Sequence, residues 1–155
     1  MKLAEALAAR ADLFRRITQL RERILDNARH QEGEEPAEDA VALLAELTDA
    51  LDEYEQLIRR INRTNAASPL GDGTVTDALA RRDVLRLHHS AVTAAADAAA
   101  GRSERGFGRQ LRSELVHVAV LPVAELRTRA DRLAREIRTV DMDIQRTNWE
   151  VDLLD

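Results

Sequence analysis

Residues 126–154 read LRTRADRLAREIRTVDMDIQRTNWEVDLL. Apolar or small side chains recur there at alternating steps of four and three residues: Leu126, Ala130, Leu133, Ile137, Val140, Ile144, Thr147, Val151 and Leu154. This heptad spacing keeps one line of side chains on one face of a helix. The stretch therefore predicts a long helix that packs against another helix along this line.

A second heptad line precedes it in the chain: Ala40, Leu44, Leu47, Leu51, Tyr54, Ile58, Ile61 and Asn65. A third apolar stripe runs through residues 3–28, where Arg10 and Arg21 fall on the stripe itself. All six Gly and all three Pro lie outside these segments, at positions that end or interrupt helices. Four helical segments are expected, at about residues 3–28, 40–65, 76–100 and 122–154.

Residues 115–121 differ from these segments, because Val116, Val118 and Val120 alternate with other residues as they do in a β-strand. No second strand is evident, so we expect its partner to come from another copy of the chain. The predicted fold is mainly all-α: one domain, 1–155, of four long helices in two antiparallel helical hairpins, with one short β segment before the last helix.

Composition narrows the possible functions. The chain has no Cys, which excludes disulfides, Cys-ligated metal centres and thiol catalysis. The first residues do not resemble a secretory signal, and no apolar run is long enough to span a membrane, so we expect a cytoplasmic protein. Residues 32–55 hold ten acids and no Lys or Arg, within a net charge of −5. This acidic segment should repel nucleic acid and anionic membranes, so neither is an expected partner.

Sequence motifs give little support for catalysis or for a bound metal. The one Glu-x-x-His match, Glu114 to His117, lies in the expected strand, where the two side chains point to opposite faces. We therefore predict no metal site and no cofactor, and we lean against an enzyme. Asp83 and His88 remain a candidate acid–base or ligand pair, although a histidine in a helix core is more often neutral and hydrogen-bonded.

Two polar clusters resemble each other. Residues 61–65 read INRTN and residues 144–148 read IQRTN, each late in a heptad helix. Asn and Thr at such places commonly satisfy the terminal carbonyls of a helix or fix the register of a seam. The alternative is a binding site, whose candidate residues are Asn62, Arg63, Thr64, Asn65, Thr147, Asn148 and Trp149.

A basic loop is the remaining candidate. Arg102, Arg105, Arg109 and Arg112 surround Phe107, and only Glu104 opposes them. Such a patch can contact RNA, phosphate or an acidic partner. A solvated loop is the more common meaning of a charge run of this kind.

Several phrases together resemble a known family: KLAEAL at residues 2–7, QEGEEP at 31–36, INRTN at 61–65, DALA at 77–80 with DVL at 83–85, and NW at 148–149. From end to end the chain is similar to small helical bacterial proteins, some of which carry the label septicolysin. The resemblance implies a helical fold and a bacterial, cytoplasmic origin. It implies no active-site residues, and a thiol-activated toxin would need the Cys that this chain lacks.

The sequence thus predicts a non-enzymatic helical protein that self-associates, as a homo-oligomer, and serves as a structural or partner-binding module. Two heptad lines and an unpaired strand favour this function. One alternative is a binder of RNA or another polyanion through residues 102–112. Another is a small-ligand or enzymatic site around Asn62, Asn65, His88 and Asn148, which requires these residues to converge.

Overall fold

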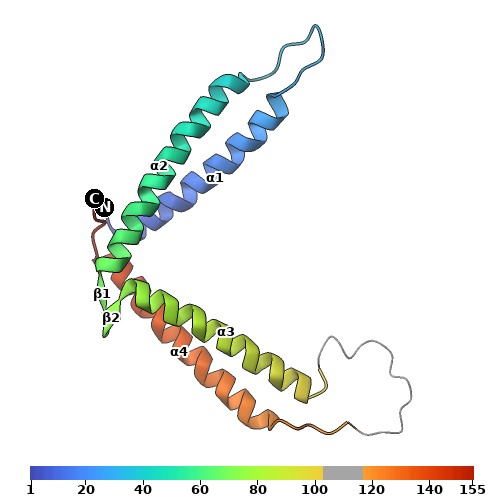
Figure 1. Ribbon diagram of the computed structural model, residues 1–155, viewed down its shortest axis with the longest axis vertical. Coiled ribbons are helices and arrows are strands. Elements are labelled where there is room, and N and C mark those ends of the chain that lie inside the picture. The colour runs from blue at the N-terminus through green and yellow to red at the C-terminus, as the bar shows by residue number, and fades with distance from the viewer. Residues whose placement is uncertain (103–116) are drawn as a thin grey trace. The chain divides into compact units, whose positions relative to one another are not determined.

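The computed structural model describes residues 1–102 and 117–155. In chain order its elements are α1 (Leu3–Asn27), α2 (Ala40–Ala67), β1 (Pro69–Leu70), β2 (Gly73–Thr74), α3 (Val75–Ala99) and α4 (Val123–Glu150). Figure 1 shows α1 beside α2 and α3 beside α4, each pair as a helical hairpin. The predicted fold class, four long helices in two hairpins with a short β segment, is confirmed. None of the described helices is long and apolar enough to cross a membrane.

The short β segment lies elsewhere than predicted. Pro69 pairs with Thr74 and Leu70 with Gly73, which forms a two-stranded antiparallel hairpin between α2 and α3. Gly71 opens its two-residue loop at φ +62°, a conformation that glycine adopts without steric cost. The prediction of a strand at 115–121 is wrong for residues 117–121, which have no strand structure, and residues 115–116 lie outside the described part. Alternating valines alone do not fix a strand, because its backbone groups need a paired neighbour.

The chain divides into two compact units, Met1–Val75 with Gln145–Asp155, and Thr76–Ile144. In the second unit, Val92 of α3 packs with Ala130 and Leu133 of α4, and Leu85 and Leu126 pack against them. Leu85 and Val92 of α3 thus face this core, whereas Val84 is 64% exposed. Of the line predicted for α4, Ala130, Leu133, Ile144 and Thr147 are buried. Leu126, Ile137, Val140 and Val151 are half-buried, Leu154 is 46% exposed, and α4 ends at Glu150, before the last two of these positions.

In the first unit α1 and α2 pack along a seam that we call the inner seam. Its buried residues are Leu3, Ala6, Leu13, Ile17 and Leu20 of α1, and Leu43, Ala50, Leu57, Ile61 and Thr64 of α2. This seam differs from the line predicted for α2. Ile61 is buried as expected and Leu47 and Tyr54 pack against the core, but Leu44 and Leu51 remain 51% and 46% exposed. Helical periodicity gives the direction of an apolar stripe, but it does not give the number of partners that cover the stripe.

Ion pairs lie along one edge of the inner seam. Arg16 donates to Glu46 at 2.7 Å, and Arg23 forms two hydrogen bonds with the carboxylate of Glu38. The hydrogen bond from Arg23 lowers the pKa of Glu38. Arg16 precedes the seam residue Ile17 by one position, and Arg23 precedes Ile24, which packs against the seam. Both arginines therefore lie about 100° round the helix from the seam. These exposed pairs make this edge of the hairpin a polar surface that faces water.

Candidate functional site

The predicted polar clusters lie at equivalent places near the ends of two helices. Thr64 precedes Ser68, the residue that caps α2, by four positions, and Thr147 precedes Val151, the first residue after α4, by four. The carbonyl of each threonine accepts the N–H of that later residue, at 2.9 Å in both cases. The similarity between residues 61–65 and 144–148 therefore coincides with the last full turn of each helix.

Thr64 is the centre of the first cluster. Its side chain is fully buried, donates to the carbonyl of Arg60 at 2.8 Å and accepts the N–H of Leu154 at 3.0 Å. Its carbonyl also accepts the hydroxyl of Ser68 at 2.7 Å. A buried polar group without such partners would cost about 1–3 kcal/mol. The hydroxyl of Thr64 thus joins α2 to the segment that follows α4.

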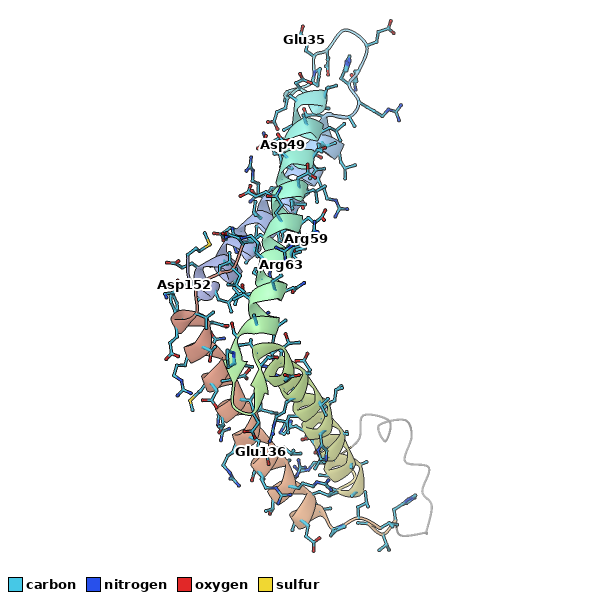
Figure 2. All side chains as sticks on the ribbon, turned by 60° about the vertical axis from the view of Figure 1, so that its left-hand side comes forward. Glu35, Asp49, Arg59, Arg63, Glu136 and Asp152 are labelled. Atoms are coloured by element: carbon cyan, nitrogen blue, oxygen red, sulfur yellow. The ribbon has the colours of Figure 1, made fainter. Side chains whose placement is uncertain are left out.

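Two arginines of α2 also bind the same segment. Arg60 donates through Nε to the carbonyl of Leu154 at 3.0 Å and through Nη2 to the carboxylate of Asp155 at 2.9 Å. Arg63 donates to the backbone oxygen of Asp155 at 2.8 Å. Figure 2 labels Arg63 together with Asp152, which belongs to this segment. Arg60 could not be predicted from the sequence, because its partners lie more than ninety residues away and no local motif marks them.

The start of the chain completes this arrangement. Leu3 N–H donates to Val151 and Leu153 N–H donates to Met1, at 3.0 and 2.9 Å. Lys2 forms an ion pair of 3.0 Å with Asp152 and thereby lowers the pKa of that carboxyl. We call residues 151–155 with these contacts the clasp. Its hydrogen bonds are made within the chain, and this favours a structural role for Thr64 and Arg63.

The other members of the polar clusters differ in exposure. Thr147 and Asn148 are buried, at 6% and 4% exposed, whereas Trp149 is 63% exposed. Asn62 is exposed and Asn65 is half-buried. A binding role for these residues stays a prediction.

Asp83 and His88 belong to the second unit. The carboxylate of Asp83 accepts from its neighbour Arg82 at 3.1 Å, and Nε2 of His88 lies 3.0 Å from Nη2 of Arg129. Since guanidinium nitrogens only donate, Nε2 of His88 must accept in this contact. Among the described residues, the recorded hydrogen bonds do not join Asp83 to His88, so their role as an acid–base pair stays a prediction.

Arg102 is the one member of the predicted basic loop that lies within the described residues. It is exposed, and its N–H donates to the carbonyl of Asp97 at 2.8 Å, just beyond the end of α3. Arg105, Arg109 and Arg112 lie outside the described residues.

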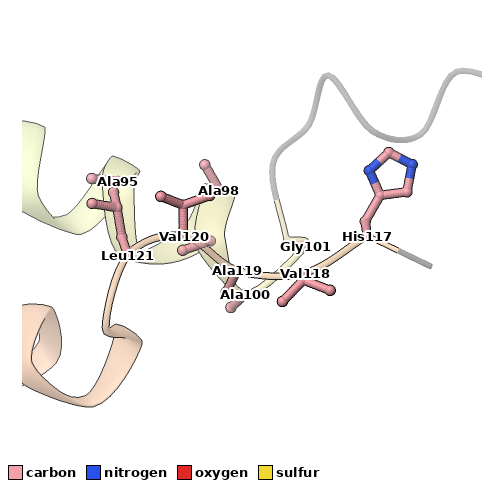
Figure 3. Close-up of a pocket in the computed structure, with 10 residues that line it drawn as sticks. Ala95, Ala98, Ala100, Gly101, His117, Val118, Ala119, Val120 and Leu121 are labelled. Atoms are coloured by element: carbon pink, nitrogen blue, oxygen red, sulfur yellow. The ribbon is translucent and has the colours of Figure 1, made fainter. Parts of the chain in front are cut away.

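A cavity of about 520 Å³ lies next to this helix end, between residues 95–101 and residues 117–121. Figure 3 shows its lining, which is alanine, glycine and apolar side chains together with His117. One imidazole among alkyl groups is not a catalytic arrangement, because acid–base chemistry needs convergent partners. Among the described residues, no cluster of three or more His, Asp or Glu side chains could hold a metal ion.

Comparisons with known proteins give a family and a similar solved structure, both described as of unknown function. Residues 10–153 match a family described as "Family of unknown function (DUF6847)". The chain is also similar to a solved structure described as "Crystal structure of a functionally unknown conserved protein from Corynebacterium diphtheriae", with 40% identity, 99% of each chain covered and a TM-score of 0.91. A comparison with curated proteins gives no match. Neither description carries the septicolysin label.

Proposed function

Since the chain belongs to the family of unknown function DUF6847, we propose a function from its own surface: it acts by association in the cytoplasm, without catalysis, as a self-associating structural or partner-binding protein. The observation that carries this proposal is an apolar surface on the α1–α2 hairpin. We call it the outer face, and its apolar residues are Leu7, Phe14 and Leu25 of α1 with Val41, Leu44, Leu51 and Ile58 of α2.

The outer face is extensively exposed. Phe14 is 57% exposed, Leu25 74% and Val41 76%, and Leu44 and Leu51 are about half exposed. Single exposed apolar residues are ordinary in soluble proteins. A run of them along both helices of one hairpin is different, because contiguous apolar surfaces commonly mark protein–protein contacts.

The two helices present these residues on the same side of the hairpin. Phe14, Leu44, Leu51 and Ile58 each follow an inner-seam residue by one position, which places them about 100° round their helices. Because α1 and α2 run in opposite directions, this rotation turns both rows towards one side. The ring of Phe14 accordingly lies 6.1 Å from that of Tyr54, which neighbours Leu51 and Ile58 on α2.

Cysteine labelling tests whether this face is covered in solution. The natural chain has no Cys, so Leu44→Cys introduces a single thiol on the outer face. We expect its alkylation rate to fall about fivefold or more as the protein concentration rises from low to high micromolar, because association buries the thiol. The matched variant Leu87→Cys, at a 72% exposed position on α3, should react at the same rate throughout. Equal concentration dependence at both positions would argue against the proposal.

A further inference from the structure

The α1–α2 hairpin has the pattern of half a four-helix bundle, and its two edges differ. On one edge, Arg16 forms an ion pair with Glu46 of α2, and Arg23 forms one with Glu38, just before α2. On the other edge are the outer-face residues, about 100° from the inner seam. A helix in an antiparallel four-helix bundle packs against two neighbours in directions roughly 90° apart. The inner seam supplies the first of these directions and the outer face supplies the second.

The heptad line read from the sequence supports the same conclusion. In α2 that line contains Leu47, Tyr54 and Ile61, which pack in the core of the hairpin, and Leu44 and Leu51, which are exposed. Its centre therefore lies about halfway between the inner seam and the outer face. This is the direction of a bundle axis, where four helices would meet, and it is not the direction of α1 alone.

We propose that a second copy of this chain covers the outer face, with α1 of each copy packed against α2 of the other around a two-fold axis parallel to the helices. This inference rests on the proposed function and adds the arrangement of the partner. A two-fold contact requires one surface to be complementary to itself. The outer face meets this condition in both side-chain packing and charge.

The packing layers follow from the height of each residue along the hairpin. Phe14 of α1 lies beside Tyr54 of α2 in its own chain. Antiparallel helices rise by the same distance per residue in opposite directions. A residue of α1 and a residue of α2 therefore lie at the same height along the hairpin when their numbers sum to about 65–68. A two-fold axis parallel to the helices preserves these levels. The layers between α1 of one copy and α2 of its partner would then be Leu7 with Ile58, Phe14 with Leu51, Thr18 with Thr48, Arg21 with Leu44, and Leu25 with Val41. Three of these five layers are apolar, one pairs two threonines, and one packs the alkyl stem of Arg21 against Leu44 while its charged end reaches water.

The distribution of charge favours this arrangement over the alternative in which α1 of one copy packs against α1 of its partner. Residues 10–23 of α1 carry five Arg and two acids, whereas residues 40–58 of α2 carry five acids and no Lys or Arg. Packing α1 against the partner's α2 brings opposite charges together. Packing α1 against the partner's α1 would bring like charges together, which is unfavourable at close range.

One pair of residues serves as the test. Arg15 and Asp52 flank the outer face at the same level, and in the proposed arrangement Arg15 of each copy faces Asp52 of the partner. Arg15 is exposed and is paired within its own helix to Asp12, and Asp52 is also exposed. Each contact occurs twice in the dimer, so a charge reversal at one position changes two contacts.

The experiment measures dimer dissociation constants by sedimentation at low salt, where ion pairs are least screened. Arg15→Glu and Asp52→Arg, each alone, should raise the dissociation constant about tenfold, since two exposed attractive contacts become repulsive. An equimolar mixture of the two variants, and the double variant, should return to within about twofold of the natural protein, because opposite charges face each other again. Arg138→Glu, at an exposed site on α4, is the control and should have no effect.

The outcomes separate the arrangement from the proposed function. A natural protein that stays monomeric would overturn both. A natural protein that dimerises, with no recovery in the mixture or the double variant, would overturn only the arrangement of α1 against the partner's α2.

Discussion

Replacing Leu51 with Glu should raise the dissociation constant for self-association by about a hundredfold or more while the chain stays folded. Leu51 is 46% exposed in the hairpin, so a carboxylate there can reach water in the free chain. In the associated state the same carboxylate would be buried opposite the partner's Phe14 without a partner of its own. Burying an unpaired charge is strongly unfavourable.

The measurement is a concentration series by sedimentation, with circular dichroism to confirm that the helices remain. The matched control is Leu87→Glu, which changes a 72% exposed leucine on α3 in the same way. Equal association constants for Leu51→Glu and the natural protein would show that the outer face is not the contact surface.

Replacing Ile61 with Ala should lower the free energy of unfolding of the first unit by about 2–5 kcal/mol. Ile61 is 1% exposed and packs among Leu3, Ala6, Leu13 and Leu57 in the core of the α1–α2 hairpin. The shorter side chain removes apolar contacts and leaves a cavity that the surrounding side chains fill only in part.

Ile58→Ala is the matched control, since the same substitution falls three residues earlier, at a half-buried position on the outer face. It should cost about 1 kcal/mol in the monomer, because less of its surface is buried, and it should weaken association. Urea unfolding at concentrations below the dissociation constant separates the two effects, because association adds apparent stability. If Ile58→Ala destabilised the monomer as much as Ile61→Ala, the division between inner seam and outer face would be wrong.

The helices could be predicted from the sequence because their apolar residues recur with the helical period and because Gly and Pro fall between them. The exposure of Leu44 and Leu51 could not be predicted. They share one heptad line with Leu47 and Tyr54, and periodicity does not tell which members of a line meet the helix of the same chain. The strand expected at 115–121 relied on alternation alone, without a partner for its backbone.

The polar clusters were found because Asn and Thr late in a heptad line depart from the apolar pattern. Their local surroundings were not predictable in full. Lys2 binds Glu150 and Arg60 binds Leu154 and Asp155, through contacts between residues that lie far apart in the sequence. Backbone carbonyls are the acceptors in several of these contacts, and every residue offers one. A sequence pattern therefore cannot mark them in advance.

Sedimentation equilibrium of the natural protein across the micromolar range tests the central claim most directly. A chain whose outer face is covered by a second copy should show a mass that rises with concentration from 17.3 kDa towards twice that value. A mass that stays at 17.3 kDa throughout this range would contradict self-association through the outer face.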